Sequence, residues 1–510
     1  MSQGSSQGMS EIRNLIVAGN GALAWIAGAA LLRAFRFREL DVLVIDTGVS
    51  RDARVGRWTL PSQRGMHGLL GVAEPQFIQQ TGATFKIATE HLGWQAEGSR
   101  FLHAHGEIGT DLQGTPFYKY LQGEALAGRP LRPEIFSLAG TAARLAKFAR
   151  PTGDGNALTS SFTYGFHLED AAYTRYMRAH ALDLGVRAGT AALADVVRSE
   201  YGDLRELRLA DGTSVSADLY IDCSGPEALL LSAIATGTGE DWSAWLPCDR
   251  MWSALAAPLG DPPPMTQTMA ATAGWVWRAP LAQSCMVGHV YSSRFQDDAG
   301  ARAMLQGVAP ALQSEPVLTK FSPGRRQKFW ERNCVALGAA AVEIEPLAGA
   351  ELHLAQLGLA NLIELFPLAL ANGIEAAEYN RLMAEHADAL RDFTIAHYRA
   401  GATRPGEFWA ATRAAPAPAR LADKLDLYAA SGRINLLDQE TFEEIDWAWL
   451  LMGSGCKPAA LELQIRDRIA KVPSQQVEML RARVEQLASS MPRHIDFVRH
   501  QATLAARAAG

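Results

Sequence analysis

The first fifty positions alternate short apolar runs with breaks rich in glycine or polar residues. Residues 15–17 are Leu-Ile-Val, which predicts a short buried strand. Residues 22–35 are rich in Ala and Leu and contain no proline, which predicts a helix, and the apolar run 41–45 predicts a second strand. A strand, a helix and a strand in this order are typical of parallel strands joined by a crossover helix, so we expect an α/β fold.

The turn between the first strand and its helix has the pattern G-x-G-x-x-A, formed by Gly19, Gly21 and Ala24. In a dinucleotide-binding unit the first glycine permits the turn and the second lets the backbone approach a pyrophosphate. The helix that begins at Ala22 would then direct free N–H groups at that anion. Asp46, at the end of the second strand, suits a ribose hydroxyl. The alternative is an ordinary strand–helix corner with glycines for packing.

A helix, a hairpin and a strand are predicted further along the chain. Residues 171–184 have apolar positions at helical spacing, and the runs 204–209 and 215–222 predict two strands around a turn at Asp211 and Gly212. The second run ends in the sequence D-C-S-G at 222–225. This arrangement completes the nucleotide domain of two-glycine flavoproteins, so it favours FAD over NAD. Residues 109–120 are predicted to be a loop.

Residues 274–280 alternate in a way that places Trp275 and Trp277 on one face of a predicted strand. A core aromatic pair is the ordinary interpretation of such a pattern. An apolar strand then runs into small residues around Leu337 and Gly338, where a flat ring could approach the backbone. A helix over 350–365 follows and includes Leu352, and the remainder of the chain is predicted to be largely helical.

The composition argues against several classes of protein but does not identify the function. The chain has 510 residues, 48% hydrophobic and 20% charged, and a net charge of −6, which gives no sign of a nucleic-acid partner. Five scattered cysteines form no C-x-x-C pair, so we expect no disulfide framework, no metal site and a reducing cytoplasm. No apolar run approaches the roughly 18 residues of a membrane span. Residues 1–10 are predicted to be a disordered lead-in without a signal peptide.

The sequence W-x-W-x-x-P, from Trp275 to Pro280, carries the most specific resemblance. With the segments 222–225, 288–295, 333–338 and 391–398, the chain resembles the flavin-dependent tryptophan halogenase family from about residue 14 to about residue 497. The resemblance implies an α/β, partly α+β, FAD-binding fold of the flavin monooxygenase type. Residues 11–365 would form the FAD-binding module with its inserted sheet and aromatic substrate region. Residues 366–510 would form a helical region over the substrate pocket.

The resemblance also implies a chemistry. A flavin reductase supplies FADH2, a flavin C4a-hydroperoxide oxidises halide, and hypohalous acid crosses a tunnel to a lysine beside an aromatic, indole- or phenol-like substrate. That lysine is Lys86, which lies between Phe85 and Ile87; without the resemblance it is an ordinary lysine at the edge of an apolar stretch. Trp275, Trp277 and Pro280 would border the tunnel. Phe442, Asp446 and Trp447 fall in a segment that lines the family's substrate pocket, and a homodimer is compatible with the resemblance.

Three departures from the family's pattern leave other functions open. Arg57 and Trp58 stand at the flavin face where the family has an acid and a small residue. Ala348 holds the position of a glutamate that partners the lysine, and Gly349, Ala350 and Glu351 replace the halide loop. Ala24 replaces a glycine of the turn. A buried carboxylate at Glu351 would repel chloride.

If residues 348–351 form the first turn of a helix, Glu351 would share a face with Ala348, with helix capping as its ordinary role. Three functions therefore remain. The chain is an FADH2-dependent halogenase with an unusual pocket, a hydroxylase or oxidase of the same fold that has lost halogenation, or a flavoprotein that only binds a ligand.

Overall fold

A six-stranded sheet in the order β20-β21-β12-β1-β2-β8 carries the nucleotide-binding half of this computed structural model. The structure describes residues 11–48, 53–155, 157–309, 311–367 and 373–509, so the predicted lead-in 1–10 lies outside the described residues. The strands are β1 Asn14–Ala18, β2 Asp41–Ile45, β8 Arg187–Ala188, β12 Leu219–Asp222, β20 Trp330–Glu331 and β21 Cys334–Ala336. β1 pairs in parallel with β2 and β12, which confirms the predicted strand–helix–strand unit.

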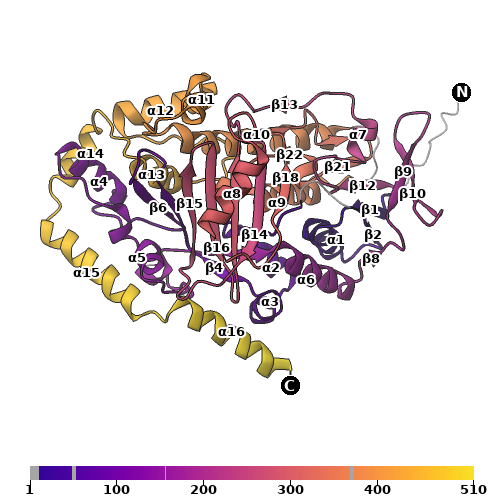
Figure 1. Ribbon diagram of the computed structural model, residues 1–510, viewed down its shortest axis with the longest axis horizontal. Helices are drawn as coiled ribbons and strands as arrows, with labels where there is room; N and C mark the ends of the chain where they lie inside the picture. Colours follow the sequence, from indigo (N-terminus) through magenta and orange to yellow (C-terminus); the bar gives the residue numbers. More distant parts are fainter. Residues whose placement is uncertain (1–10, 49–52, 156, 310, 368–372, 510) are drawn as a thin grey trace, which may run out of the picture.

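A seven-stranded sheet in the order β18-β14-β17-β16-β15-β5-β6 forms the centre of the molecule (Figure 1). Its strands are β5 Ala88–Leu92, β6 Arg100–Ala104, β14 Arg250–Ala256, β15 Met265–Ala271, β16 Gly274–Pro280, β17 Cys285–Tyr291 and β18 Val317–Lys320. The predicted strand with the two tryptophans is β16, and both Trp275 and Trp277 are buried. β5 pairs in parallel with β15 and antiparallel with β6, so the chain returns to this sheet from a distant segment.

A third, small sheet has the strand order β3-β7-β4. Its strands are β3 Gly56–Trp58, β4 Thr84–Lys86 and β7 Gly165–Glu169. Arg57 pairs with Leu168 of β7, and Lys86 pairs with Gly165 of the same strand. The predicted flavin-side residue and the predicted lysine therefore lie on the two outer strands of one sheet.

Helices cover the sheets and dominate the last third of the chain, as predicted (Figure 1). The α-helices of the first part are α1 Ala22–Ala34, α2 Ser62–Leu70, α3 Glu74–Thr81, α4 Phe117–Leu126, α5 Leu138–Arg144, α6 Asp170–Asp183, α7 Leu231–Ile234, α8 Asp298–Val308 and α9 Glu351–Glu364. Those of the last part are α10 Ile374–Arg399, α11 Glu407–Ala414, α12 Ala419–Ser431, α13 Glu444–Gly453, α14 Leu463–Ile469, α15 Ser474–Ser490 and α16 His494–Ala509. The boundary between residues 365 and 366 stays a prediction.

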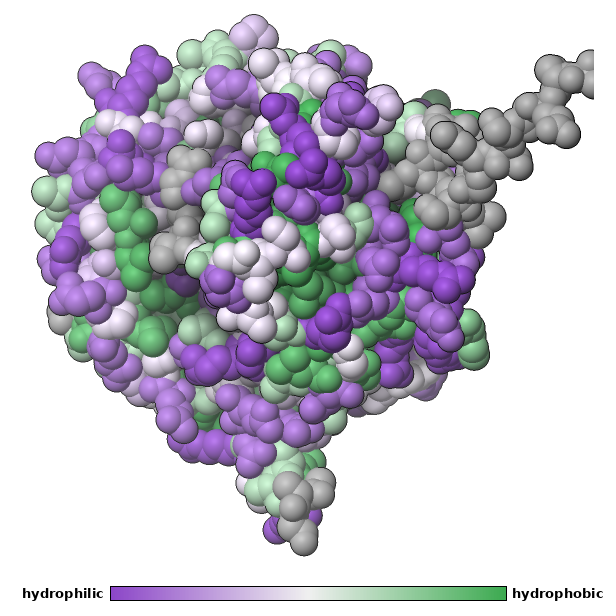
Figure 2. Space-filling model, turned by 90° about the vertical axis from the view of Figure 1, so that its right-hand side faces the viewer, coloured by the Kyte–Doolittle hydropathy of each residue, from purple (hydrophilic) through white to green (hydrophobic). Residues whose placement is uncertain are grey.

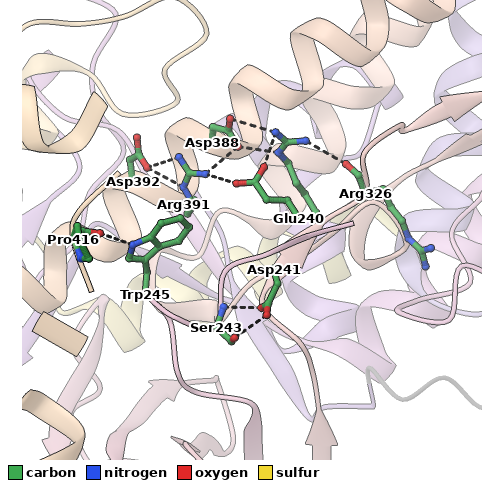
Figure 3. A network of polar contacts seen from close by, with 10 residues as sticks. Glu240, Asp241, Ser243, Trp245, Arg326, Asp388, Arg391, Asp392 and Pro416 are labelled. Atoms are coloured by element: carbon green, nitrogen blue, oxygen red, sulfur yellow. Dashed lines mark hydrogen bonds and ion pairs between the residues drawn. The ribbon is translucent and has the colours of Figure 1, made fainter. Parts of the chain in front are cut away.

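A network of charged side chains fastens α10 to the rest of the fold (Figure 3). Arg391 of α10 contacts the carboxylates of Glu240, Asp388 and Asp392. Its guanidinium also lies over the ring of Trp245, 5.3 Å from the ring centroid. Glu240 belongs to a sheet of three short strands, β13 Glu240–Asp241, β19 Gly324–Arg325 and β22 Val342–Glu343. The network therefore connects the helical last third with a segment about 150 residues earlier.

Two local predictions were wrong. The run 215–222 is not one strand: it divides into β11 Ser214–Val215, which forms a hairpin sheet with β9 Leu193–Arg198 and β10 Leu204–Leu209, and β12, which joins the six-stranded sheet. The expected loop 109–120 ends early, because α4 begins at Phe117 directly after Pro116. Proline has a fixed φ and no N–H, so it is well suited to precede a helix, and the break that it signals is a helix start.

Candidate active site

A cavity of about 550 Å³ opens where β1 and β12 end against α1. Seven residues singled out from the sequence line it: Gly21, Ala22, Arg57, Leu337, Gly338, Glu351 and Leu352. Four others predicted to bind the cofactor, Gly19, Ala24, Asp46 and Trp58, do not line the cavity as the described residues outline it. Direct contact of these four with a flavin stays a prediction.

Gly19 and Gly21 of the turn meet different structural requirements. A Cβ on Gly19 would lie 2.6 Å from the carbonyl oxygen of Cys223, so this position is needed for close packing of β1 against the end of β12. Its φ is not positive, so the clash with Cys223 and not a left-handed backbone requires glycine here. A Cβ on Gly21 would meet no protein atom within 4 Å, so the space in front of it is open to a ligand. Gly338 has a φ of +64°, which favours glycine over other residues.

Two residues at the cavity wall, Arg57 and Glu351, differ in charge from what the sequence comparison with the family implied. Each forms an ion pair with a residue of opposite charge. Arg57, unexpected at a flavin face, makes two hydrogen bonds to the carboxylate of Asp170, one of them 2.7 Å from Nε to Oδ1. Glu351, expected to repel an anion, lies 2.5 Å from the guanidinium of Arg54. Arg175 and Lys320 add two more cationic side chains to the lining. Glu343 also lines the cavity, so the lining described here carries four cationic and three anionic side chains and a small excess of positive charge.

These features fit FAD. The open backbone at Gly21 and the N-terminus of α1 suit a pyrophosphate, and Leu337 and Gly338 line the cavity where a flat ring could lie against them. Asp46 follows β2, and its Oδ1 accepts a hydrogen bond from the N–H of Gly48. That geometry fixes the carboxylate at the carboxyl edge of the sheet, where a ribose would be bound.

The loop before α9 differs from the geometry assumed for it. A 3₁₀-helix covers Pro346–Ala348, Gly349 has a φ of +64°, and α9 begins only at Glu351. Ala348 and Glu351 are therefore not on one face of a helix, and the N-cap position of α9 is held by Ala350, whose side chain cannot form a cap hydrogen bond. The side chain of Glu351 is held by Arg54. The expectation that Ala348 and Glu351 share a helix face was therefore wrong, whereas Glu351 does lie in the first turn of a helix, where negative charge is favoured.

Trp58 fills the space beside this loop. A Cβ on Gly349 would lie 2.3 Å from Cδ1 of Trp58, so the indole lies directly against the loop backbone. The indole also packs edge-on against Trp277 of β16, with ring centroids 5.1 Å apart. Both rings are almost wholly buried. Trp58 is therefore packed between the backbone at Gly349 and the ring of Trp277.

Lys86 is buried away from the cavity, with 1% of its surface exposed. Its Nζ lies 2.6 Å from Nε2 of His105. Burial lowers the pKa of the Lys86 amine to about 7, and the carboxylate of Asp446 acts in the opposite direction. An amine that titrates near neutral pH can act both as a cation and as a nucleophile.

An aromatic cluster stands near the histidines beside Lys86. The ring of Phe393, from α10, stacks on Phe442 with centroids 3.7 Å apart and meets Trp447 edge-on at 4.9 Å. Phe393 also lies edge-on to His103, at 6.0 Å. Trp447 is buried and donates its Nε1–H to the carboxylate of Glu440, so its position is fixed by packing and by this hydrogen bond. Its role toward a substrate, like that of Phe442, stays a prediction.

The histidines of β6 and its end were missed from the sequence. His103 and His105 are two residues apart, and this spacing places both on one face of a strand. Nε2 of His103 lies 2.9 Å from Oδ1 of Asp446, the residue of α13 that was predicted to line the substrate pocket. The alternation in the sequence F-L-H-A-H, 101–105, is the signal that could have drawn attention to them.

The surface gives little further sign of a partner. On the face in Figure 2, hydrophobic atoms lie mainly in recesses between hydrophilic side chains. Among the described residues, no helix is long and apolar enough to cross a membrane. The same residues contain no cluster of three or more His, Cys, Asp or Glu side chains suited to a metal ion.

Comparison with known proteins gives one consistent result. The family model described as tryptophan halogenase matches residues 14–468. The chain is 26% identical over 519 residues to the 7-chloro-L-tryptophan 6-halogenase KtzR of Kutzneria sp. (strain 744), covering 95% of this chain and 98% of that protein.

Two solved structures are more similar in sequence. One is Xcc4156, a flavin-dependent halogenase from Xanthomonas campestris, with 31% identity, a TM-score of 0.89, and 96% of this chain and 98% of that chain covered. The other is BrvH, a flavin-dependent halogenase from Brevundimonas sp. BAL3, with 30% identity, a TM-score of 0.90, and 96% and 99% covered.

Proposed function

This chain belongs to the tryptophan halogenase family, and from that premise we propose that it halogenates an indole- or phenol-like aromatic ring with Lys86 as the halogenating lysine. Enzymes of this family are flavin-dependent and use FADH2. The observation that carries the proposal is the burial of Lys86 outside the flavin cavity, in contact with His105. The ring of His105 lies beside His103, which in turn meets Phe393 of the aromatic cluster. A separate flavin reductase would supply the FADH2.

The cavity residues would bind and orient the cofactor. The backbone at Gly21 and Ala22 would hold the pyrophosphate, and Leu337 and Gly338 would lie against the flavin ring. When bound, the reduced flavin supplies, with O2, the oxidising power that turns halide into hypohalous acid. Trp58 and Trp277, which are buried and packed edge-on, would keep bulk water from the path between the flavin and Lys86.

The residues around Lys86 would perform the transfer. Burial keeps part of the amine neutral at physiological pH, so it can either hold hypohalous acid by a hydrogen bond or accept the halogen on nitrogen. The carboxylate of Asp446 and the neighbouring histidines set the electrostatic environment of that nitrogen. The identity of the ring, the position halogenated, the preferred halide, a homodimer and a cytoplasmic location stay predictions.

A second candidate function has one observation in its favour. Trp58 packs against Gly349, and Ala348 has no polar side-chain atom, so the loop offers less to a halide than the family pattern implies. A family member with this loop could oxidise reduced flavin and hydroxylate or oxidise a ligand without halogenating it.

One reaction set separates these functions. Purified protein, FAD, a flavin reductase, NADH and bromide are incubated with a panel of indoles and phenols, and the products are identified by mass spectrometry. We expect a brominated product from the wild type and none from Lys86→Met, with flavin oxidation unchanged in both. Lys119→Met is the matched control, because Lys119 is another buried lysine, bonded instead to the carbonyl of Gly432. Oxygenated products without bromination would support the second function.

A further inference from the structure

The position of His105 follows from the backbone. Its N–H donates to the carbonyl of Ile87 at 2.8 Å, and its own carbonyl accepts from the N–H of Thr163 at 2.9 Å. The next residue, Gly106, is held in turn by the indole N–H of Trp449, 3.0 Å from its carbonyl. The imidazole is therefore delivered to Lys86, the neighbour of Ile87, by an ordered strand end and not by a loose loop.

The acids near the lysine have other partners or lie farther away. Ala348 has no polar atom, and Glu351 is paired with Arg54. Glu345 accepts a hydrogen bond from the hydroxyl of Tyr398 at 3.0 Å. Asp446 is engaged by Nε2 of His103 and by the N–H of Glu443, 2.9 Å away in both cases. His105 is therefore the side chain within hydrogen-bond distance of the Lys86 amine in the part of the chain that the structure describes.

Resting on the proposed function, we propose that His105 is the positioning residue of Lys86, doing the work that Ala348 cannot do. A neutral imidazole accepts one hydrogen from the ammonium form of Lys86 through Nε2 and so fixes where the amine points. Burial and the nearby lysine keep the pKa of His105 well below its usual value, so the ring stays neutral and able to accept. A carboxylate in the same place would instead hold the amine fully charged.

Titratable groups on or next to β5, β6, β7 and α13 interact electrostatically with Lys86. His91 of β5, His105 beyond β6 and His167 of β7 are each kept neutral by burial, with the charge of Lys86 as a further cause. Asp446 of α13 is the acid that favours the ammonium form. Removing the acceptor at His105 should therefore disfavour the charged amine.

The test measures the lysine directly as well as the reaction. Protein labelled with ¹³Cε-lysine is titrated by NMR, and the signal lost in Lys86→Met identifies Lys86. We expect His105→Phe to lower the pKa of Lys86 by about one unit, since an acceptor for the charged form is lost. His105→Gln keeps an acceptor near the place of Nε2 and should restore most of the wild-type value.

Bromination is measured on the same variants. His105→Phe should lower kcat about tenfold with KM nearly unchanged and shift the pH profile with the amine, and His105→Gln should recover most of the rate. His386→Phe is the matched control, because that buried imidazole faces the carbonyl of Gln439 instead.

Different results would overturn the positioning role of His105 and the proposed function. An unchanged Lys86 pKa in His105→Phe, or a His105→Gln variant no better than His105→Phe, overturns the positioning role. Full bromination by Lys86→Met overturns the proposed function, whatever the titration shows.

Discussion

The guanidinium of Arg54 lies 2.5 Å from the carboxylate of Glu351, across a distance of 297 residues in the sequence. Both side chains are mostly buried, with 10% and 16% exposed, at the wall of the large cavity. The carboxylate of Glu351, which was predicted to repel an anion, therefore has a cation in direct contact with it. The pair makes this part of the wall close to neutral at physiological pH.

Replacing Glu351 by Gln should tighten the binding of FAD. The change removes one negative charge from the cavity wall. At an effective dielectric constant near 20, a distance of about 10 Å and with screening by salt, the repulsion between this charge and the ligand is about 1 kcal/mol. Its loss corresponds to a roughly fivefold lower Kd. Flavin fluorescence titration measures it. Glu364→Gln, at the exposed far end of the same helix, is the control and should change nothing. Equal affinity in Glu351→Gln and wild type would mean that the carboxylate does not act on the ligand.

Substitutions of Gly21 and Gly19 should affect different properties, the first FAD binding and the second stability. Gly21 has φ −91° and ψ 173°, which other residues adopt easily, and its Cβ direction is open. Gly21→Val should therefore keep the melting temperature and weaken FAD binding at least about tenfold. Gly19→Ala forces a methyl group against the carbonyl of Cys223 and should lower the free energy of unfolding by about 1–3 kcal/mol. A stable Gly21→Val variant that binds FAD normally would contradict this account of the site.

Two arginines of α10 should differ sharply in their effect on stability. Arg391 is buried among three carboxylates, and Arg391→Met would strand Asp392, whose pKa burial already raises to about 6. We expect a loss of about 2–4 kcal/mol in the free energy of unfolding. Arg381 pairs with Glu378 and Glu385 at the exposed face of the same helix, so Arg381→Met should have little effect. Denaturant unfolding of the two variants compares them, and similar losses would argue against the network of Figure 3 as an anchor.

Glu345 should make stability depend on pH. Burial raises the pKa of its carboxyl to about 7, above the value of about 4.3 expected in the unfolded chain. The folded state therefore holds more protons between these values, and the contribution of this group to stability is lost as pH rises toward 7. Relative to wild type, Glu345→Gln should be more stable at pH 8 than at pH 5.

Thermal unfolding at a series of pH values tests this prediction. The exposed Glu485→Gln variant is the control and should differ from wild type by the same amount at each pH. A Glu345→Gln difference that does not change between pH 5 and pH 8 would show that Glu345 is ionised in the folded protein throughout.

The local parts of the fold could be predicted from the sequence, and the long-range parts could not. β1, α1 and β2 follow from apolar periodicity within 32 residues. The division of 215–222 between two sheets depends on which distant strand each half pairs with, β10 or β1 and β21. Periodicity carries no information on that choice.

The same limit applies to the site. Lys86 was found because a motif surrounds it, and Gly21 because the turn has a known use. His105 reaches Lys86 only through the pairing of β5 with β6, and Arg54 reaches Glu351 only once the whole chain is folded. Partners joined by tertiary pairing were therefore missed, and the cation that offsets the charge of Glu351 was missed with them.

The shared strand β7 has a consequence for engineering. Arg57 at the cavity and Lys86 in the interior are both held to β7 by main-chain hydrogen bonds, whereas Phe393, Phe442 and Trp447 come from the later helical part of the chain. A mutant library confined to those aromatic positions would vary substrate selection while leaving the spacing between cofactor and lysine intact. Under the proposed function, the residues that hold the cofactor and the lysine therefore belong to a different part of the fold from the aromatic positions, and directed evolution could address those positions alone.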